Sequence, residues 1–396
     1  MTSLATRATG APPRRTGEWL EDPGFGVYVH VPFCLHRCHY CDFNAYAGDD
    51  DVHDDYVVAL VRCIERCDPA RRAATSVFFG GGTPTLLPPA RLGGVLRALR
   101  DHVGVAPGAE VTVEANPETV DEAAFEALLE AGFNRVSIGV QSTSARVLRA
   151  LGRTHGASRA LDALRAARRA GVPDVNADLI FGSPWESTAE WRESLERVVD
   201  AGCDHVSAYA LTVEEGTPLH TLVATGRAPD VDPDVQAERH GVACELLAAA
   251  GYERYEVSNW ARPGRACAHN VLYWSAGDYL GFGAGAHAHV GGRRSWTLRL
   301  PRAFVAAVAA GRPVEDGAEE IDADARAGEA LALGLRLVGG VDVAGFARRF
   351  GTEPLARRAG TLRRLAAAGL VDDSGGRLRV APRATLVANE VFAALL

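Results

Sequence analysis

Short apolar runs alternate through the first 250 residues with amphipathic stretches of helical period. The apolar runs are rich in β-branched and aromatic residues, which is typical of buried strands. They predict strands at 26–30, 77–79, 111–117, 135–141, 175–182 and 205–211. Apolar residues spaced three and four apart predict the intervening helices, at 50–67, 89–103, 120–131, in two parts up to 170, at 188–199 and at 234–250.

This alternation of strand and helix, repeated about six times, predicts an α/β fold with a parallel sheet and right-handed crossovers. Eight repeats would close a full barrel, so about six predict a partial (β/α)6 barrel. We place the barrel at residues 23–250. Residues 1–22 contain Pro12-Pro13 and no apolar run, and we expect them to form a disordered lead.

The pattern changes beyond residue 250. Residues 251–300 are rich in glycine and contain the segment His-Asn-Val-Leu-Tyr-Trp, and we expect a linker region there. Residues 301–396 predict helices at 325–337, 343–350 and 355–368, followed by a short hairpin around Gly375-Gly376. Helices followed by a hairpin predict a small α+β domain of the winged-helix type at the C-terminal end.

Polar residues stand where predicted strands meet their following loops, at Glu114, Gln141 and Asp178. The carboxyl ends of parallel strands form the ligand-binding face of α/β folds, so these side chains are candidates for one site. Gly80-Gly81-Gly82-Thr83-Pro84 follows another strand, and glycine allows a ligand to approach the backbone closely. Solvated rim residues and an ordinary tight turn are the alternative interpretations.

Three thiols, Cys34, Cys38 and Cys41, follow the first predicted strand with the spacing C-x3-C-x2-C. A loop of this kind can place three thiolates on three corners of a cubane 4Fe–4S cluster and leave the fourth iron open to a small molecule. The alternative is a structural zinc site with His30, His36 or His39 as the fourth ligand. Zinc sites usually combine a C-x2-C pair with a second pair further on, and the sequence contains no such second pair.

Composition limits the classes of function. Hydrophobic residues make up 47% and charged residues 23%, which is the profile of a globular protein. The net charge of −8 argues against nucleic acid as a partner. No apolar run approaches the ~20 residues that span a bilayer, and no secretory signal is recognisable. Eight scattered cysteines show no disulfide framework, so we expect a reducing, cytoplasmic location.

The cysteine spacing resembles that of radical S-adenosylmethionine (SAM) proteins. The resemblance implies that the open iron chelates the amino and carboxylate groups of SAM, and that an electron donor reduces the cluster so that the sulfonium is cleaved. It also implies a radical SAM partial barrel, with SAM bound by the residues that match the family's SAM-binding positions: Tyr28, Gly81, Gly82, Thr83, Glu114, Gln141, Arg153 and Asp178. A carboxylate suits ribose hydroxyls or an ammonium, and arginine suits a carboxylate.

Within that superfamily the chain resembles the oxygen-independent coproporphyrinogen III oxidase (HemN-like) family over about residues 26–395. The motifs that carry this resemblance include Glu114-Ala-Asn-Pro117, Ser137-Ile-Gly-Val-Gln-Ser142 and Gly281-Phe-Gly-Ala-Gly-Ala-His287. Oxidases of the family have a further cysteine two residues after the third ligand, where this chain has Phe43. Cys-Asp-Phe and His-Asn-x-x-Tyr-Trp instead resemble the HemW-type heme-chaperone branch.

This branch resemblance implies that the protein binds heme and delivers it to an acceptor protein, with His269, Asn270, Tyr273 and Trp274 at the heme. Imidazole is a common axial ligand of heme iron, and the aromatic rings could pack on the macrocycle. A packed, hydrogen-bonded histidine is the alternative. Covalent attachment has no Cys-x-x-Cys-His motif, and Cys267 is a weak candidate. His287 and His289 could supply a second ligand, although the glycines around them favour close packing.

Two other functions compete with heme delivery. One is the anaerobic decarboxylation of coproporphyrinogen III to protoporphyrinogen IX. The other is RNA modification, which the net charge and the lack of an added RNA-binding domain make the weakest. A homodimer and a transient association with a membrane are further expectations for a heme carrier.

Overall fold

The computed structural model describes residues 17–68 and 72–396. Its centre is a twelve-stranded sheet with the strand order β14-β13-β12-β11-β1-β4-β5-β6-β7-β8-β10-β9. Six of these strands are the expected barrel strands, and they are parallel: β1 (Phe25–Val31), β4 (Ala74–Gly81), β5 (Val105–Ala115), β6 (Arg135–Gln141), β7 (Asp174–Phe181) and β8 (His205–Ala210). The predicted partial (β/α)6 barrel is therefore confirmed.

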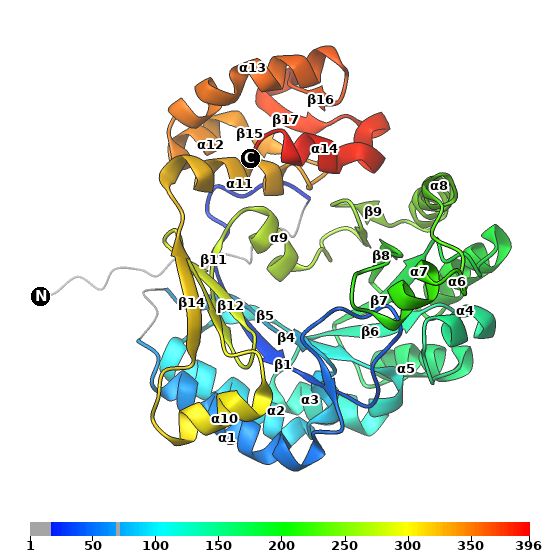
Figure 1. The fold of residues 1–396 in the computed structure, drawn as a ribbon, viewed down its shortest axis with the longest axis vertical. Coiled ribbons are helices and arrows are strands. Elements are labelled where there is room, and N and C mark those ends of the chain that lie inside the picture. The colour runs from blue at the N-terminus through cyan, green and yellow to red at the C-terminus, as the bar shows by residue number, and fades with distance from the viewer. Residues whose placement is uncertain (1–16, 69–71) are drawn as a thin grey trace, which may run out of the picture.

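Helices connect these strands and cover the outside of the barrel (Figure 1). They are α1 (His53–Glu65), α2 (Pro89–Ala98), α3 (Glu122–Ala131), α4 (Ala145–Ala150), α5 (Ala157–Arg169), α6 (Thr188–Asp200), α7 (Pro218–Ala224) and α8 (Pro233–Ala249). Several begin with a side-chain cap, and α6 has a full capping box between Ser187 and Glu190. No helix in the described ranges combines the length and apolar character needed to cross a bilayer.

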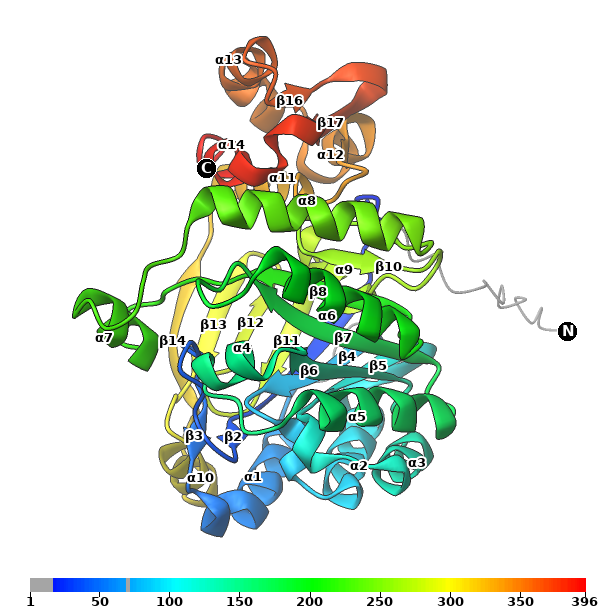
Figure 2. The ribbon, with the colours of Figure 1, turned by 90° about the vertical axis from the view of Figure 1, so that its right-hand side faces the viewer.

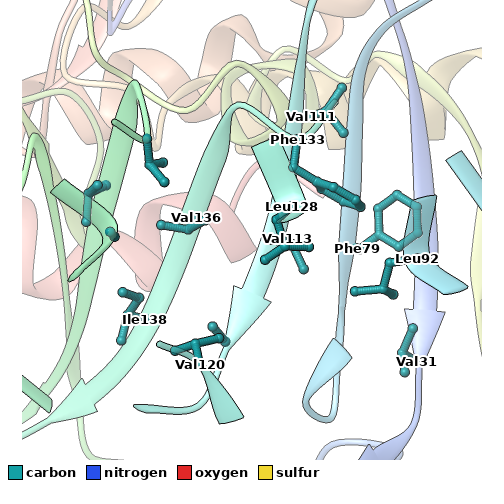
Figure 3. Packing of buried hydrophobic residues seen from close by; sticks show 14 of the residues in the cluster. Val31, Phe79, Leu92, Val111, Val113, Val120, Leu128, Phe133, Val136 and Ile138 are labelled. Carbon is teal, nitrogen blue, oxygen red and sulfur yellow. The ribbon is translucent and has the colours of Figure 1, made fainter. Parts of the chain in front are cut away.

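Alternate residues of the barrel strands point outward into a layer of apolar side chains that the helices also fill (Figure 3). Phe79 of β4 meets Phe133, which follows α3, edge-on with ring centroids 5.0 Å apart. The intervening residues, such as Gly80, Glu114 and Asp178, point toward the barrel interior. The sequence therefore separates an apolar outer face from a polar interior on the same strands.

The expected linker at 251–300 is instead part of the central sheet. It contains β9 (Glu253–Arg254) and β10 (Asn259–Ala261), which add to β8, and β11 (Asp278–Phe282), which pairs with β1 in parallel. β12 (His287–Val290), β13 (Arg293–Thr297) and β14 (Glu315–Glu320) continue the sheet beside β11 (Figure 2). These strands are short or charged, so their sequence lacks the apolar run that identifies a buried strand.

The C-terminal domain also begins later than the predicted residue 301. Helix α10 (Pro301–Ala309) packs against α1, and its Phe304 belongs to the barrel's apolar core. The separate domain then contains α11 (Ala323–Gly334), β15 (Val341–Asp342), α12 (Val343–Phe350), α13 (Glu353–Ala367), β16 (Val371–Asp372), β17 (Arg377–Val380) and α14 (Ala388–Ala393). These four helices and the three-stranded sheet β15-β17-β16 agree with the expected winged-helix-like α+β domain.

The expected lead ended at residue 22, but part of it is folded. Trp19 is only 4% exposed and belongs to the apolar core of the C-terminal domain, with its ring 6.0 Å from that of Phe346. Residues 1–16 of the expected lead lie outside the described residues. A lone tryptophan in a polar segment gives no periodic signal, so its burial was not predictable from the local pattern.

Candidate functional site

A cavity of about 480 Å³ opens at the carboxyl ends of the barrel strands. All three predicted cluster thiols and seven of the eight predicted SAM residues line it: Cys34, Cys38, Cys41, Gly81, Gly82, Thr83, Glu114, Gln141, Arg153 and Asp178. These residues come from five separate strands and the loops that follow them. The fold therefore gathers one site from positions as far apart in sequence as Cys34 and Asp178.

The remaining predicted SAM residue, Tyr28, lies beside the cavity and not on its wall. Its hydroxyl is 2.9 Å from Nδ1 of His30, and its ring stacks on that of Phe78 with centroids 6.4 Å apart. His30 in turn places Nε2 2.9 Å from the carbonyl oxygen of Asn44. The His30 ring thus connects the Tyr28 hydroxyl to Asn44, which lies at the end of the cysteine loop.

The cysteine loop is held at both ends by a small parallel pair, β2 (Phe33–Cys34) and β3 (Tyr46–Ala47). The Sγ atom of Cys34 accepts a long contact of 3.8 Å from Thr83 Oγ1, and that of Cys38 lies 3.4 Å from Arg153 Nη1. Burial raises the pKa of the Cys34 thiol to about 11. A cationic metal centre bound at the loop would instead lower this pKa and favour the thiolate.

The arrangement of ligands does not favour the zinc alternative. Among the described residues, no three His, Cys, Asp or Glu side chains converge as ligands of one metal ion do. His30 is engaged by Tyr28 and Asn44, and Nδ1 of His39 lies 3.1 Å from the carbonyl oxygen of Ala150. The two histidines are therefore engaged elsewhere, and three thiols that share one cavity match the number of protein ligands expected for a cubane with one open iron.

The glycine run at the end of β4 forms the wall facing the thiols. Gly81 has a φ of +116°, which side chains with a Cβ rarely adopt, and a Cβ there would collide with the His30 ring. A Cβ on Gly82 would lie 2.6 Å from the carbonyl oxygen of Phe33. Both glycines are therefore required by the close approach of this loop to the cysteine loop.

Two half-buried carboxyl groups face the cavity. Glu114 Oε2 accepts a 3.0 Å hydrogen bond from the Gly81 N–H, and burial together with the neighbouring Asp178 raises its pKa to about 7. Asp178 accepts 2.8 Å hydrogen bonds from Ser137 Oγ and Asn176 Nδ2, while burial raises its pKa. Within the described chain, no arginine forms an ion pair with either carboxyl group, so the pair is suited to a cationic ligand.

Gln141 and Arg153 complete the wall. Gln141 has a φ of +65°, an uncommon conformation for a non-glycine residue and a frequent mark of functional sites. The Arg153 guanidinium donates to the carbonyl oxygen of Gly139 at 2.9 Å, while its Nε is buried without a partner. An arginine fixed in this way can receive a carboxylate.

Two family models match this chain. The Radical SAM superfamily model matches residues 28–198, and the HemN C-terminal domain model matches residues 321–387. The chain is 42% identical over 377 residues to a Mycobacterium tuberculosis protein named heme chaperone HemW, covering 94% of this chain and 95% of that protein. The chain belongs to the HemW family of radical SAM proteins. A Bacillus subtilis member is 32% identical over 93% of this chain and 98% of its own length.

A solved structure gives the same fold. The coproporphyrinogen III oxidase HemN from Escherichia coli superimposes with a TM-score of 0.80, covering 96% of this chain and 91% of that one, at 22% identity. At that identity the likeness shows the fold alone. Membership of the radical SAM superfamily implies a 4Fe–4S cluster and SAM, and the donors of the cavity fit both: three thiols for the cluster, and glycines, carboxyl groups and an arginine for SAM.

The segment His269 to Trp274, expected at the heme, forms most of α9 (Ala268–Trp274). This helix contacts Gly26 and Ser76 near the amino-terminal ends of β1 and β4, whereas the thiol cavity lies at the carboxyl ends of the strands. His269 is 1% exposed, its Nδ1 lies 2.9 Å from Ser76 Oγ, and burial lowers its pKa to about 3. Asn270 donates to the Tyr255 hydroxyl at 3.2 Å. The structure does not offer the His269 imidazole to a heme, so it argues against that expected ligand.

Tyr273 and Trp274 differ from His269, because both line a smaller cavity of about 240 Å³ between the sheet and the C-terminal domain. Arg336 covers the Trp274 ring at 4.3 Å. The thiol cavity also has lining residues that the sequence reasoning missed, among them Tyr40 and Tyr209. Tyr209 could have been found, since it stands at the end of a predicted strand like Glu114 and Asp178. Tyr40 lies between the cysteines and had no such signal.

Proposed function

We propose that this protein binds heme and delivers it to an acceptor protein, on a scaffold that holds a 4Fe–4S cluster and SAM. The observation that carries the proposal is the match along nearly the whole chain to relatives named heme chaperone HemW. Both radical SAM cavity and C-terminal domain are included in that match. The proposal therefore concerns the barrel together with the C-terminal domain, and not the barrel alone.

Cys34, Cys38 and Cys41 are the ligands we propose for the cluster, because all three line the same cavity at the carboxyl ends of the barrel strands. The bound cluster and SAM together supply one-electron chemistry at the sulfonium. Glu114 and Asp178 would offset the positive charge of SAM, and Arg153 would receive its carboxylate. The Gly81–Gly82 turn leaves the space that a ligand needs beside the thiols.

Phe43 favours heme delivery over decarboxylation of coproporphyrinogen III. It replaces the further cysteine of the oxidases, lines the cavity mouth, and is 65% exposed. An exposed phenyl ring at a mouth can contact an apolar ligand or a partner protein, but it cannot ligate a metal. The proposed partners are heme, an acceptor protein and an electron donor. A homodimer, a transient membrane association and a cytoplasmic location remain part of the proposal.

The test is to reconstitute the protein anaerobically and titrate it with heme while recording the Soret band. Saturable heme binding, followed by transfer to an apo-hemoprotein, supports the proposal. A parallel incubation with coproporphyrinogen III, SAM and a reductant measures protoporphyrinogen formation. Absence of a saturable Soret change, or product formation in the parallel incubation, would reject heme delivery as the main function.

A further inference from the structure

The strands β11 to β14 present two rows of side chains on one face of the sheet. In the first row His287 of β12 is opposite Trp296 of β13, and Trp296 is opposite Gly317 of β14. In the second row Tyr279, His289 and Arg294 are successive partners. Because side chains two residues apart share a face, both rows lie on the same surface.

This face is flat around His287 and Trp296. The Trp296 indole lies over Gly317, where a Cβ would collide with the ring. The imidazole of His287 lies beside the indole, with centroids 5.9 Å apart and planes 31° from parallel. Gly281 of β11 also has no side chain. The strands therefore form a low, partly aromatic surface with one imidazole on it.

His287 is more available than the other histidines near the sheet. It is exposed, and no hydrogen bond to its ring occurs within the described residues. His289 by contrast has a buried Nε2, and Nδ1 lies 3.6 Å from Asp278. Desolvation, with the nearby Arg294 and Arg299, lowers the pKa of His287, so the imidazole is neutral and able to bind a metal at neutral pH.

Arg299 follows β13 and lies near enough to His287 to lower its pKa, so it adds a positive charge beside this face. Its side chain is in no ion pair within the part of the chain that the structure describes, whereas Arg294 is held by Glu319 and Glu329 at 2.6 Å each. Heme combines an iron that takes an axial imidazole, a flat apolar ring and two propionates. His287, Trp296 and Arg299 offer one group for each of these parts.

We propose that the face of β11–β14 is the heme site of this protein, with His287 as the axial ligand, Trp296 at the edge of the ring and Arg299 at a propionate. This inference rests on the proposed heme-delivering function and names its site. The site adjoins the cluster loop, since the Asn44 amide donates to the carbonyl oxygens of both Ala284 and Arg299 at 3.0 Å. It lies away from His269, which the structure buries.

The experiment titrates the cluster-loaded full-length protein and its variants with heme, and follows the Soret band and tryptophan emission. We expect His287→Ala to weaken heme binding by about tenfold or more and to shift the Soret band. His102→Ala, which removes an exposed histidine far from this face, is the matched control and should bind as wild type does. Trp296→Phe should reduce the quenching of emission by heme.

A second variant keeps the test decisive if His287→Ala does not fold. Arg299→Glu should weaken the binding of heme several-fold but leave the binding of heme dimethyl ester unchanged, because the ester has no carboxylates. If wild type binds heme and both variants bind equally well, the site is wrong while the function stands. If wild type itself binds no heme, the proposed function fails with it.

Discussion

We expect the Glu114 carboxyl group to lower the stability of the barrel at alkaline pH, where its ionised form also favours SAM binding. Its pKa is raised from the ordinary 4.5 to about 7, first by burial and then by Asp178. The folded protein therefore holds this proton more tightly than the unfolded chain, so the contribution to stability is present below pH 4.5 and is lost as the pH rises through 7. At 1.36 kcal/mol per unit, the loss at pH 8 amounts to about 3 kcal/mol.

Glu114→Gln removes the charge and keeps an oxygen that can accept the Gly81 N–H. We expect the variant without SAM to unfold at a higher urea concentration than wild type at pH 8, with the difference disappearing near pH 5. SAM affinity should show the opposite effect. In wild type it should rise about tenfold from pH 6 to pH 8, as the carboxyl group ionises, and the variant should show no such rise.

The assay combines urea unfolding, followed by circular dichroism, with equilibrium dialysis of labelled SAM against cluster-loaded protein. The control variant must not disturb the packing of the barrel. Asn134→Asp is unsuitable, because the Asn134 side chain forms hydrogen bonds with the backbone of β5. Glu126→Gln on the outer helix α3 is suitable, since it changes the same group at the surface. If Glu114→Gln is no more stable than wild type at pH 8 and keeps the pH dependence of SAM binding, the charge argument is refuted.

The other predictions concern single positions. Cys38→Ser should abolish the cluster absorbance and iron content, whereas Cys63→Ser, outside the loop, should keep both. Gly81→Ala should lose SAM binding, as measured by dialysis. Gly108→Ala, also at positive φ but with open space around it, should cost only about 1 kcal/mol of stability and bind SAM normally. Trp19→Ala should lower the free energy of unfolding by about 3 kcal/mol, and no change in the urea midpoint would show that its packing is unimportant.

The sequence predicted the barrel well because each of its strands carries an apolar signal of its own. Val111 and Val113, for example, belong to a continuous apolar run, and both side chains are buried in the sheet. It also predicted the cavity, since Glu114 and Asp178 had to meet once their strands were parallel and adjacent to β6. These inferences needed only local pattern and the geometry of parallel sheets.

The parts that sequence reasoning missed depend on contacts between distant segments. Strand β14, Glu315–Glu320, has no large apolar residue and is held by Arg293 and Arg294 of β13. Strand β11 joins the sheet through β1, some 250 residues earlier in the chain. The burial of His269 likewise comes from Ser76 and from the Phe78 ring 5.3 Å away. No local pattern reports such pairings.

The central claim is that one polypeptide carries both a cluster at Cys34, Cys38 and Cys41 and a heme. The most direct measurement quantifies iron, acid-labile sulfide and heme on a single anaerobically reconstituted and heme-loaded sample, beside the variant in which all three cysteines are serine. The account predicts that wild type contains sulfide and heme together, and that the variant loses the sulfide. Sulfide retained by the variant, or heme absent from wild type, would contradict it.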